Sequence, residues 1–205
     1  MSQASVLSSC GTSEEPGSLP NGSGENTQPP APGSTACAGE KALSLKRWAD
    51  YPRVYERFVS NGGNPADIIT LRSSADVLNN FSPMLPPRQF SFKSESAVNG
   101  RNFSVSTDCQ LNVSSFLLKD RRTPSKNIHH HLLAKGNEVL TAGVIFFYHT
   151  GNRIRKVVLA NRSNRYCPSP ESLEIARKIL IEEGVESDRI VILNNVNEKC
   201  QITAP

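Results

Sequence analysis

The sequence predicts an α+β domain on a mostly antiparallel sheet with a few flanking helices, preceded by a disordered N-terminal tail. Short alternating apolar runs are typical of strands, and they include two neighbouring runs that look like a hairpin. Two segments show helical spacing instead, one near the start of the folded part and one near its end. A sharp change in composition at residue 40 separates the tail from the rest.

Residues 1–40, the N-terminal tail, differ from the rest of the chain in composition. Residues 1–40 contain no Lys, Arg or aromatic residue, and 22 of them are Ser, Gly, Pro or Thr. Such a segment buries too little apolar surface to offset the entropy of ordering, so we expect it to be disordered, as an export or linker segment. Its net charge is −4, whereas residues 41–205 carry +8 and have the size of a single domain.

The first helix is predicted over residues 50–60. Aromatic residues recur there at helical spacing, Pro52 suits a first turn, and Gly62 follows the end. The pattern of residues 64–81 fits neither helix nor strand alone, and its type stays open. Prolines at 83, 86 and 87 indicate a loop.

Alternating or continuous apolar runs predict the strands, and a turn over residues 149–152 joins the last two of them as a hairpin. These runs are 90–92, 103–105, 111–116, 139–148 and 153–160. Residues 119–127 are polar and basic and are predicted to form a loop.

The second helix begins with Ser169 as a predicted N-cap and Pro170 in the first helical position. Apolar residues then form one stripe, and Gly184 suits a left-handed C-cap. Residues 190–193 are predicted to be a final strand.

Several functional classes are excluded or disfavoured. No apolar run approaches the roughly 20 residues of a membrane span. The start lacks the basic and apolar regions of a signal peptide, and Ser2 stands where myristoylation needs Gly. Five scattered cysteines without a C-x-x-C pair predict reduced thiols rather than a disulfide framework. We expect no cofactor, since phosphate-loop and dinucleotide motifs are absent.

The triplet His129-His130-His131 is the most conspicuous candidate site. On a strand, His129 and His131 would share one face and could bind zinc, but such a site needs further ligands. The candidates for a third ligand are His149, Cys109, Cys167 or a carboxylate. We expect no metal, and instead a strand edge with one buried, hydrogen-bonded histidine and two partly exposed ones.

Basic residues gather over residues 119–126 and 153–165. Nucleotide phosphates, nucleic acid or an acidic protein could meet them, but no nucleic-acid module is visible, so we do not expect nucleic acid. A solvated face is the favoured interpretation. Arg162 and Arg165 are the exceptions, because they precede the start of a helix, where anions are stabilised.

A set of motifs recurs in a fixed order over residues 100–193: the strand pair 103–113, His129-His130, Gly136, Ala142-Gly143, Gly151 and the run Asn161-Arg162-Ser163-Asn164-Arg165-Tyr166-Cys167-Pro168-Ser169. In these motifs residues 100–193 resemble a domain of plant IQ-motif-containing (IQM) calmodulin-binding proteins and of bacterial effector-like proteins. The family has two serines where His131 and Leu132 stand, and Gly-His where Asn164-Arg165 stand. No IQ motif is present, so calmodulin binding does not transfer.

The tail and the resemblance together predict a bacterial effector-like protein, exported by type III secretion into a host cytosol, where it binds a host protein. Its ligand-binding residues would be His129, His130, Arg162, Arg165 and Tyr166. One alternative is a transferase-type enzyme acting on a nucleotide-like substrate such as NAD, with His130 and Tyr166 as catalytic candidates and Arg165 on phosphate. The other is a cytoplasmic regulatory binding protein whose tail is only a linker.

Overall fold

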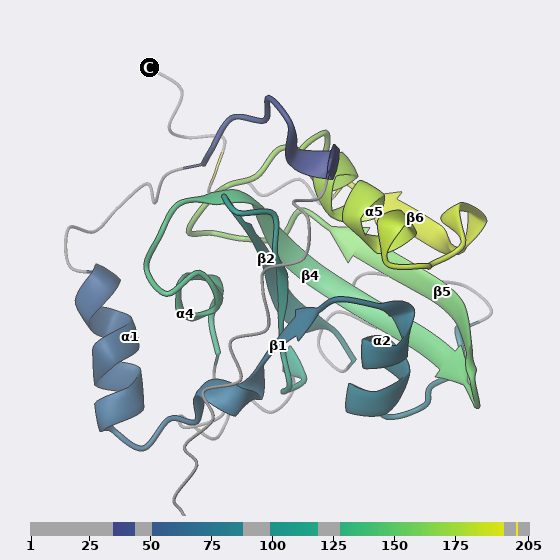
Figure 1. Ribbon diagram of the computed structural model, residues 1–205, viewed down its shortest axis with the longest axis horizontal. Coiled ribbons are helices and arrows are strands. Elements are labelled where there is room, and N and C mark those ends of the chain that lie inside the picture. The colour runs from purple at the N-terminus through teal and green to yellow at the C-terminus, as the bar shows by residue number, and fades with distance from the viewer. Residues whose placement is uncertain (1–34, 44–50, 88–98, 119–127, 195–199, 201–205) are drawn as a thin grey trace, which may run out of the picture. The chain divides into compact units, whose positions relative to one another are not determined.

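The computed structural model describes residues 35–43, 51–87, 99–118 and 128–194 together with Cys200, all within one compact unit over residues 31–205. A six-stranded sheet in the order β1-β3-β2-β4-β5-β6 forms its centre (Figure 1). All neighbours pair antiparallel except β5 and β6, which confirms the predicted α+β class. The strands are β1 Ile68–Leu71, β2 Arg101–Ser106, β3 Leu111–Ser114, β4 Val139–Thr150, β5 Arg153–Ala160 and β6 Ile190–Leu193.

Four α-helices flank this sheet in the described part of the chain: α1 Tyr51–Ser60, α2 Ser74–Asn80, α4 His130–Leu133 and α5 Leu173–Glu182. Figure 1 shows α1 and α4 beside each other on one side of β2 and β4, and α2 and α5 on the other. The described residues also contain three short 3₁₀ turns, at Thr35–Cys37, Pro65–Asp67 and Ser187–Arg189.

Most predicted elements are confirmed. The helix over 50–60, the strands around 103–105 and 111–116, the hairpin and the final strand all occur within a few residues of their expected bounds. The undecided segment 64–81 contains a 3₁₀ turn, β1 and α2 in succession. The predicted strand 90–92 and loop 119–127 lie outside the described residues.

The sequence pattern predicted that the histidine triplet lies on a strand, and this prediction is wrong. His129 is extended backbone before α4, and His130 and His131 lie in the first turn of that helix. Therefore His129 and His131 do not share a strand face.

The start of α5 is also corrected, from Ser169 to Leu173. Before the α-helix begins, the backbone makes hydrogen bonds between residues three apart, as in a 3₁₀ turn. The Leu173 N–H donates to the Pro170 carbonyl, and the Glu174 N–H donates to the Glu171 carbonyl. The Ser169 hydroxyl accepts the Ser172 N–H at 3.3 Å, so it organises this turn rather than capping the α-helix. Gly184 follows the helix with φ +91°, as predicted for a C-cap.

The two faces of the sheet differ in chemistry because side chains alternate along each strand. One face is apolar: Phe103, Val113 and Phe147 pack with α2 and α5 in the largest core cluster. On the opposite face of β2 and β3 the intervening residues are polar: Asn102, Ser104, Asn112 and Ser114. This polar strip lies on the side of the sheet where α4 packs, since the Asn102 Nδ2 donates to the Ile128 carbonyl at 2.8 Å.

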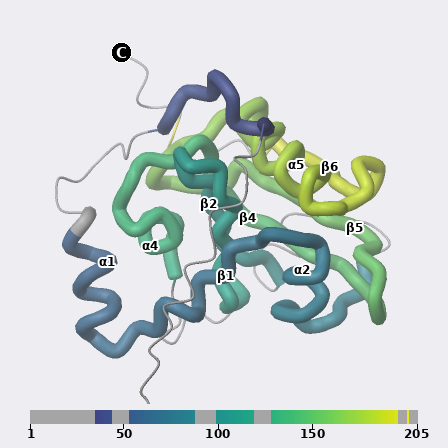
Figure 2. The backbone as a smooth tube through the Cα atoms, in the orientation of Figure 1, coloured from purple at the N-terminus to yellow at the C-terminus, as the bar shows by residue number. Residues whose placement is uncertain are grey.

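Residues 35–43 pack beside α5, which is visible at the purple end of the tube in Figure 2. The Thr35 hydroxyl donates to the Glu182 carboxylate at 2.8 Å, and Glu40 lies 3.8 Å from the Lys178 ammonium. Leu43 forms an isolated antiparallel bridge with Val139 of β4. The predicted tail boundary at residue 40 therefore falls within a segment that contacts the folded domain.

Two disulfides correct the prediction of reduced thiols. Cys37 pairs with Cys109, with 5.9 Å between their Cα atoms, and Cys167 pairs with Cys200, at 5.5 Å. The sequence separations are 72 and 33 residues, so no local spacing rule could indicate either pair. Each closes a long loop, which in the chain-entropy account stabilises the fold by about 4 kcal/mol.

In the described part of the chain, no helix has the length and apolar character that a membrane crossing requires.

Complete oxidation of both pairs leaves one of the five cysteines, Cys10, as a thiol. We expect denatured, unreduced protein to react with one equivalent of a thiol reagent, and reduced protein with five. The Cys109→Ser variant should show one additional thiol, from Cys37, in the unreduced measurement. A count of five before reduction would contradict both pairings.

Gly143 lies where a side chain has no room. A Cβ added there would collide with the Ala160 carbonyl oxygen and approach the Phe103 ring to 2.9 Å. We expect Gly143→Ala to lower the free energy of unfolding by about 1–3 kcal/mol, the usual cost of overpacking a core, as measured by urea denaturation.

Glu174→Ala, on the exposed face of α5, is the control and should change the free energy by less than about 0.5 kcal/mol. Equal stability of Gly143→Ala and the unaltered protein would show that the approach of β5 to Gly143 is not tight.

Candidate functional site

Two segments far apart in the sequence form the candidate site. The first is α4 with its flanking residues, and the second is the loop 161–168 between β5 and α5. They meet because Tyr166 packs against Ala134, Val139 and Ala142 in one apolar cluster.

His130 is buried, and its Nε2 lies 2.8 Å from the Gly143 carbonyl oxygen of β4. Because a carbonyl only accepts, Nε2 carries the proton of this hydrogen bond. His130 therefore attaches α4 to the central strand, and this nitrogen is occupied by the backbone.

His131 is buried, and the groups near it are two further histidines and Arg165. Its ring stacks on that of His129 with 5.6 Å between centroids. Burial first, and then the nearby charges of His129, Arg165 and His130, lower the pKa of His131 to about 3. The ring is therefore neutral throughout the physiological range, and Arg165 is one of the groups that keep it so.

Tyr166 is 1% exposed, and its hydroxyl donates to the Asn137 carbonyl at 2.9 Å. The rest of the loop is held in the same manner: the Asn161 amide donates to the Pro168 carbonyl, and the Tyr166 N–H donates to the Ser163 hydroxyl. These contacts make the loop a fixed corner between β5 and α5.

Cys167 continues this corner with a left-handed backbone at φ +47°, which is uncommon for any residue other than Gly, Asn or Asp. Its disulfide attaches Cys200, whose sulfur lies 3.8 Å from the Ser163 carbonyl oxygen. Cys200 is thus covalently joined to the corner.

The five predicted ligand-binding residues are therefore brought together only in part. Arg165 lies close enough to His131 to lower the pKa of that ring, as do His129 and His130, and Tyr166 packs against Ala134 just after α4. Arg162 is half-buried on the same loop, and its backbone N–H donates to the Ala160 carbonyl at 2.8 Å. Neither catalytic candidate presents an exposed side chain: His130 is 7% and Tyr166 is 1% exposed.

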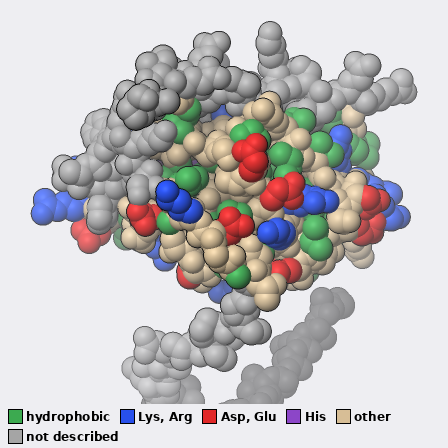
Figure 3. Space-filling model, turned by 90° about the horizontal axis from the view of Figure 1, so that it is seen from above, with side chains coloured by type: hydrophobic (Ala, Val, Ile, Leu, Met, Phe, Trp, Pro, Cys, Tyr) green, Lys and Arg blue, Asp and Glu red, His purple; other side chains and the backbone are tan. Residues whose placement is uncertain are grey.

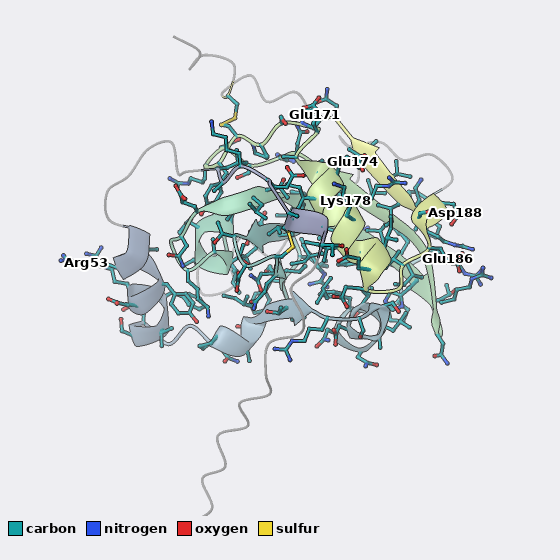
Figure 4. All side chains as sticks on the ribbon, turned by 45° about the horizontal axis from the view of Figure 1, so that its top comes forward. Arg53, Glu171, Glu174, Lys178, Glu186 and Asp188 are labelled. Carbon is teal, nitrogen blue, oxygen red and sulfur yellow. A yellow bond between two sulfur atoms is a disulfide. The ribbon has the colours of Figure 1, made fainter. Side chains whose placement is uncertain are left out.

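The start of α5, where an anion was expected, already has a carboxylate. The Glu171 backbone N–H, followed by the Ser169 hydroxyl, lowers the pKa of the Glu171 carboxyl by hydrogen bonding. Glu171 and Glu174 both appear at the exposed side of this end of the helix (Figure 4).

Arg153 and Arg189, outside the 161–168 corner, are each paired with an acidic residue. Glu186 lies 3.6 Å from the Arg153 guanidinium and 2.9 Å from that of Arg189. Figure 3 shows acidic and basic side chains interspersed on the face that it presents. Arg153 and Arg155 of β5 are exposed, which agrees with a solvated face for these basic residues.

No group of three or more His, Cys, Asp or Glu side chains in the described ranges is arranged to hold a metal ion. The proposed third ligands are engaged elsewhere: Cys109 and Cys167 are in disulfides, and the His149 Nε2 lies 2.9 Å from the Phe81 carbonyl oxygen.

Nothing in the sequence pattern indicated Asn137 as the partner of Tyr166, because the contact uses its backbone carbonyl, which carries no residue-type signal. No protein-family model, curated protein or solved structure matches the chain.

The lowered pKa of His131 predicts a loss of stability in acid. The unfolded ring has the ordinary pKa of 6.5 and the folded ring about 3, so the unfolded state binds the proton first as the pH falls. The part of the folding stability that depends on a neutral His131 ring is fully present above pH 6.5 and is lost progressively as the pH falls toward 3. We expect His131→Gln to reduce this loss, measured by urea denaturation across that interval.

Arg165→Gln should reduce the loss to a smaller extent, because it removes one of the positive charges that lower the pKa of His131. Arg177→Gln, on α5, serves as the control and should follow the unaltered protein. If His131→Gln and the unaltered protein lost stability equally, His131 would not be the titrating group.

Proposed function

We propose that the chain is an exported, effector-like protein whose folded part binds and modulates a host factor, with residues 1–40 as the delivery segment. The composition of the tail supports the delivery part of the proposal: 22 of its residues are Ser, Gly, Pro or Thr, and none is basic. The resemblance of residues 100–193 to effector-like proteins supports it independently.

One observation favours binding over catalysis: the two catalytic candidates are occupied with holding the fold. The His130 Nε2 and the Tyr166 hydroxyl each bond to a backbone carbonyl, at 2.8 and 2.9 Å. A general acid or base must instead reach its substrate and titrate near the working pH. His131, with its pKa of about 3, does not meet the second requirement.

The surface that this proposal assigns to a partner is the corner over residues 161–168. Arg162 and Arg165 are both half-buried there, so part of each side chain reaches the surface. Because the backbone beneath them is fixed by Tyr166 and by the Cys167–Cys200 disulfide, the arginines are presented with little loss of entropy on binding. Acidic side chains on the partner would complement them.

The two disulfides limit the compartments in which the oxidised form of the protein can persist. Disulfides persist in oxidising compartments and are reduced in a cytosol. We infer that the doubly crosslinked form belongs outside a reducing cytosol, and that delivery into a host cytosol would convert it to the thiol form. The oxidation state of the four paired cysteines at the site of action therefore distinguishes two cases. Free thiols would fit an effector in a host cytosol, and intact disulfides would fit a binding protein that acts outside it.

Fusing residues 1–40 to a reporter enzyme tests the delivery step. We expect the reporter to reach the host cytosol from bacteria that have a type III secretion apparatus, and not from an isogenic strain that lacks it. A fusion of the same 40 residues in reverse order controls for composition alone.

Absence of translocation would remove the delivery part of the proposal. Equal delivery by the reversed segment would assign it to composition rather than to order. A rise in melting temperature on addition of NAD that Arg165→Gln abolishes would replace the binding proposal by the transferase alternative.

A further inference from the structure

A polar pocket of about 330 Å³ lies on the polar face of β1 and β3, apart from the corner over residues 161–168. Its floor comes from these strands, and its walls come from α1, from the turn between β2 and β3, and from the residues after α4. The side chains that concern its chemistry are Tyr55, Thr70, Asp108, Gln110, Asn112 and Lys135.

The floor is an ordered cross-strand row. Thr70 pairs with Asn112, and Asn112 pairs with Ser104 on the next strand. The Thr70 hydroxyl donates to the Asn112 Oδ1 at 2.7 Å, which orients the amide. Among the described residues no acceptor takes the Asn112 NH₂ group, so this donor can serve a ligand in the pocket.

The interior beneath this row also has polar groups to satisfy. The Ser104 hydroxyl is fully buried and has no hydrogen-bond partner within the described part of the chain. The Asn102 Oδ1, on the same face of β2, is also buried and has no hydrogen-bond partner within the described part of the chain. Neither side chain lines the pocket, but both add to the polar character of the sheet face on which the pocket lies.

The walls are held in uncommon backbone conformations. Lys135 has φ +52° and Cys109, between Asp108 and Gln110, has φ +65°; both values are left-handed. Non-glycine residues in this region cluster at functional sites. The Cys37–Cys109 disulfide fixes one of these walls, and the Lys135 ammonium lies 5.7 Å from the centre of the Tyr55 ring on the other.

We propose that this pocket binds an uncharged, hydroxyl-rich small molecule of monosaccharide size. Asp108 and Lys135 are the two charged residues of its lining, and their opposite charges leave no preference for an anion. The amides of Gln110 and Asn137 each offer a donor and an acceptor, and the Asn112 amide offers its NH₂ donor, which matches hydroxyl groups that also donate and accept.

The Tyr55 ring completes the match, because the carbon-bound hydrogens of a sugar ring can pack on an aromatic face. The size agrees as well: about 330 Å³ is at the lower end of the usual range of roughly 300–1,000 Å³ for ligand pockets. One small ring fits such a volume, whereas a dinucleotide does not.

This site is independent of the proposed partner surface, since its lining includes neither Arg162 nor Arg165. Its one link to the corner is Asn137, which lines the pocket and whose carbonyl accepts the Tyr166 hydroxyl. Failure of either proposal leaves the other standing.

Nuclear magnetic resonance of the ¹⁵N-labelled full chain tests the pocket directly. Glucose, galactose, mannose and N-acetylglucosamine would be titrated separately, with inorganic phosphate and NAD as charged comparisons. We expect at least one sugar to shift the side-chain NH₂ signals of Gln110, Asn112 and Asn137 saturably, with a dissociation constant on the order of 1 mM for so small a ligand.

Tyr55→Ala and Asp108→Asn should each weaken binding about tenfold, the effect of losing one good contact. Arg177→Gln, on α5, should leave it unchanged. Unchanged backbone signals at β2 and β4 would show that the variants remain folded. The proposal is overturned if no sugar gives saturable shifts, if the shifts survive both pocket variants, or if only phosphate or NAD shifts these signals.

Discussion

The close approach of β5 to Gly143 is the constraint on which the candidate site depends. The Ala160 carbonyl lies where a side chain of residue 143 would be, so β5 can end there and turn into the 161–168 corner. The Gly143 carbonyl meanwhile accepts the His130 hydrogen bond that holds α4. One backbone position therefore fixes both segments of the site, and Tyr166 closes the arrangement by bonding to Asn137 after α4.

The sheet has two chemically different faces, and this difference organises the rest. Phe103, Val113 and Phe147 join α2 and α5 in an apolar core that supplies most of the stability. The opposite face of β2 and β3 is polar and receives α4 and the pocket. A stable apolar layer on one side allows the other side to bury polar groups, which cost stability unless they are satisfied.

The conspicuous histidines are structural in this arrangement, whereas the pocket lies where no motif drew attention. His130 holds a helix and His131 is kept neutral by burial, so neither has the environment of a catalytic base. The alternating polar residues of β2 and β3 were the one available signal for the pocket. That signal is weak in a sequence, because alternation is equally typical of a strand with one solvated face.

The sequence by itself determined the α+β class, the hairpin and the α5 stripe, because each follows from local periodicity and turn chemistry. Tertiary structure decided the rest. It placed His130 and His131 on a helix, since the hydrogen bond to Gly143 and the burial of Leu132 and Leu133 outweigh a short local pattern. It also paired cysteines 72 and 33 residues apart and assembled the pocket from four segments. Contacts between such distant residues depend on how the chain folds back on itself, which local periodicity does not encode.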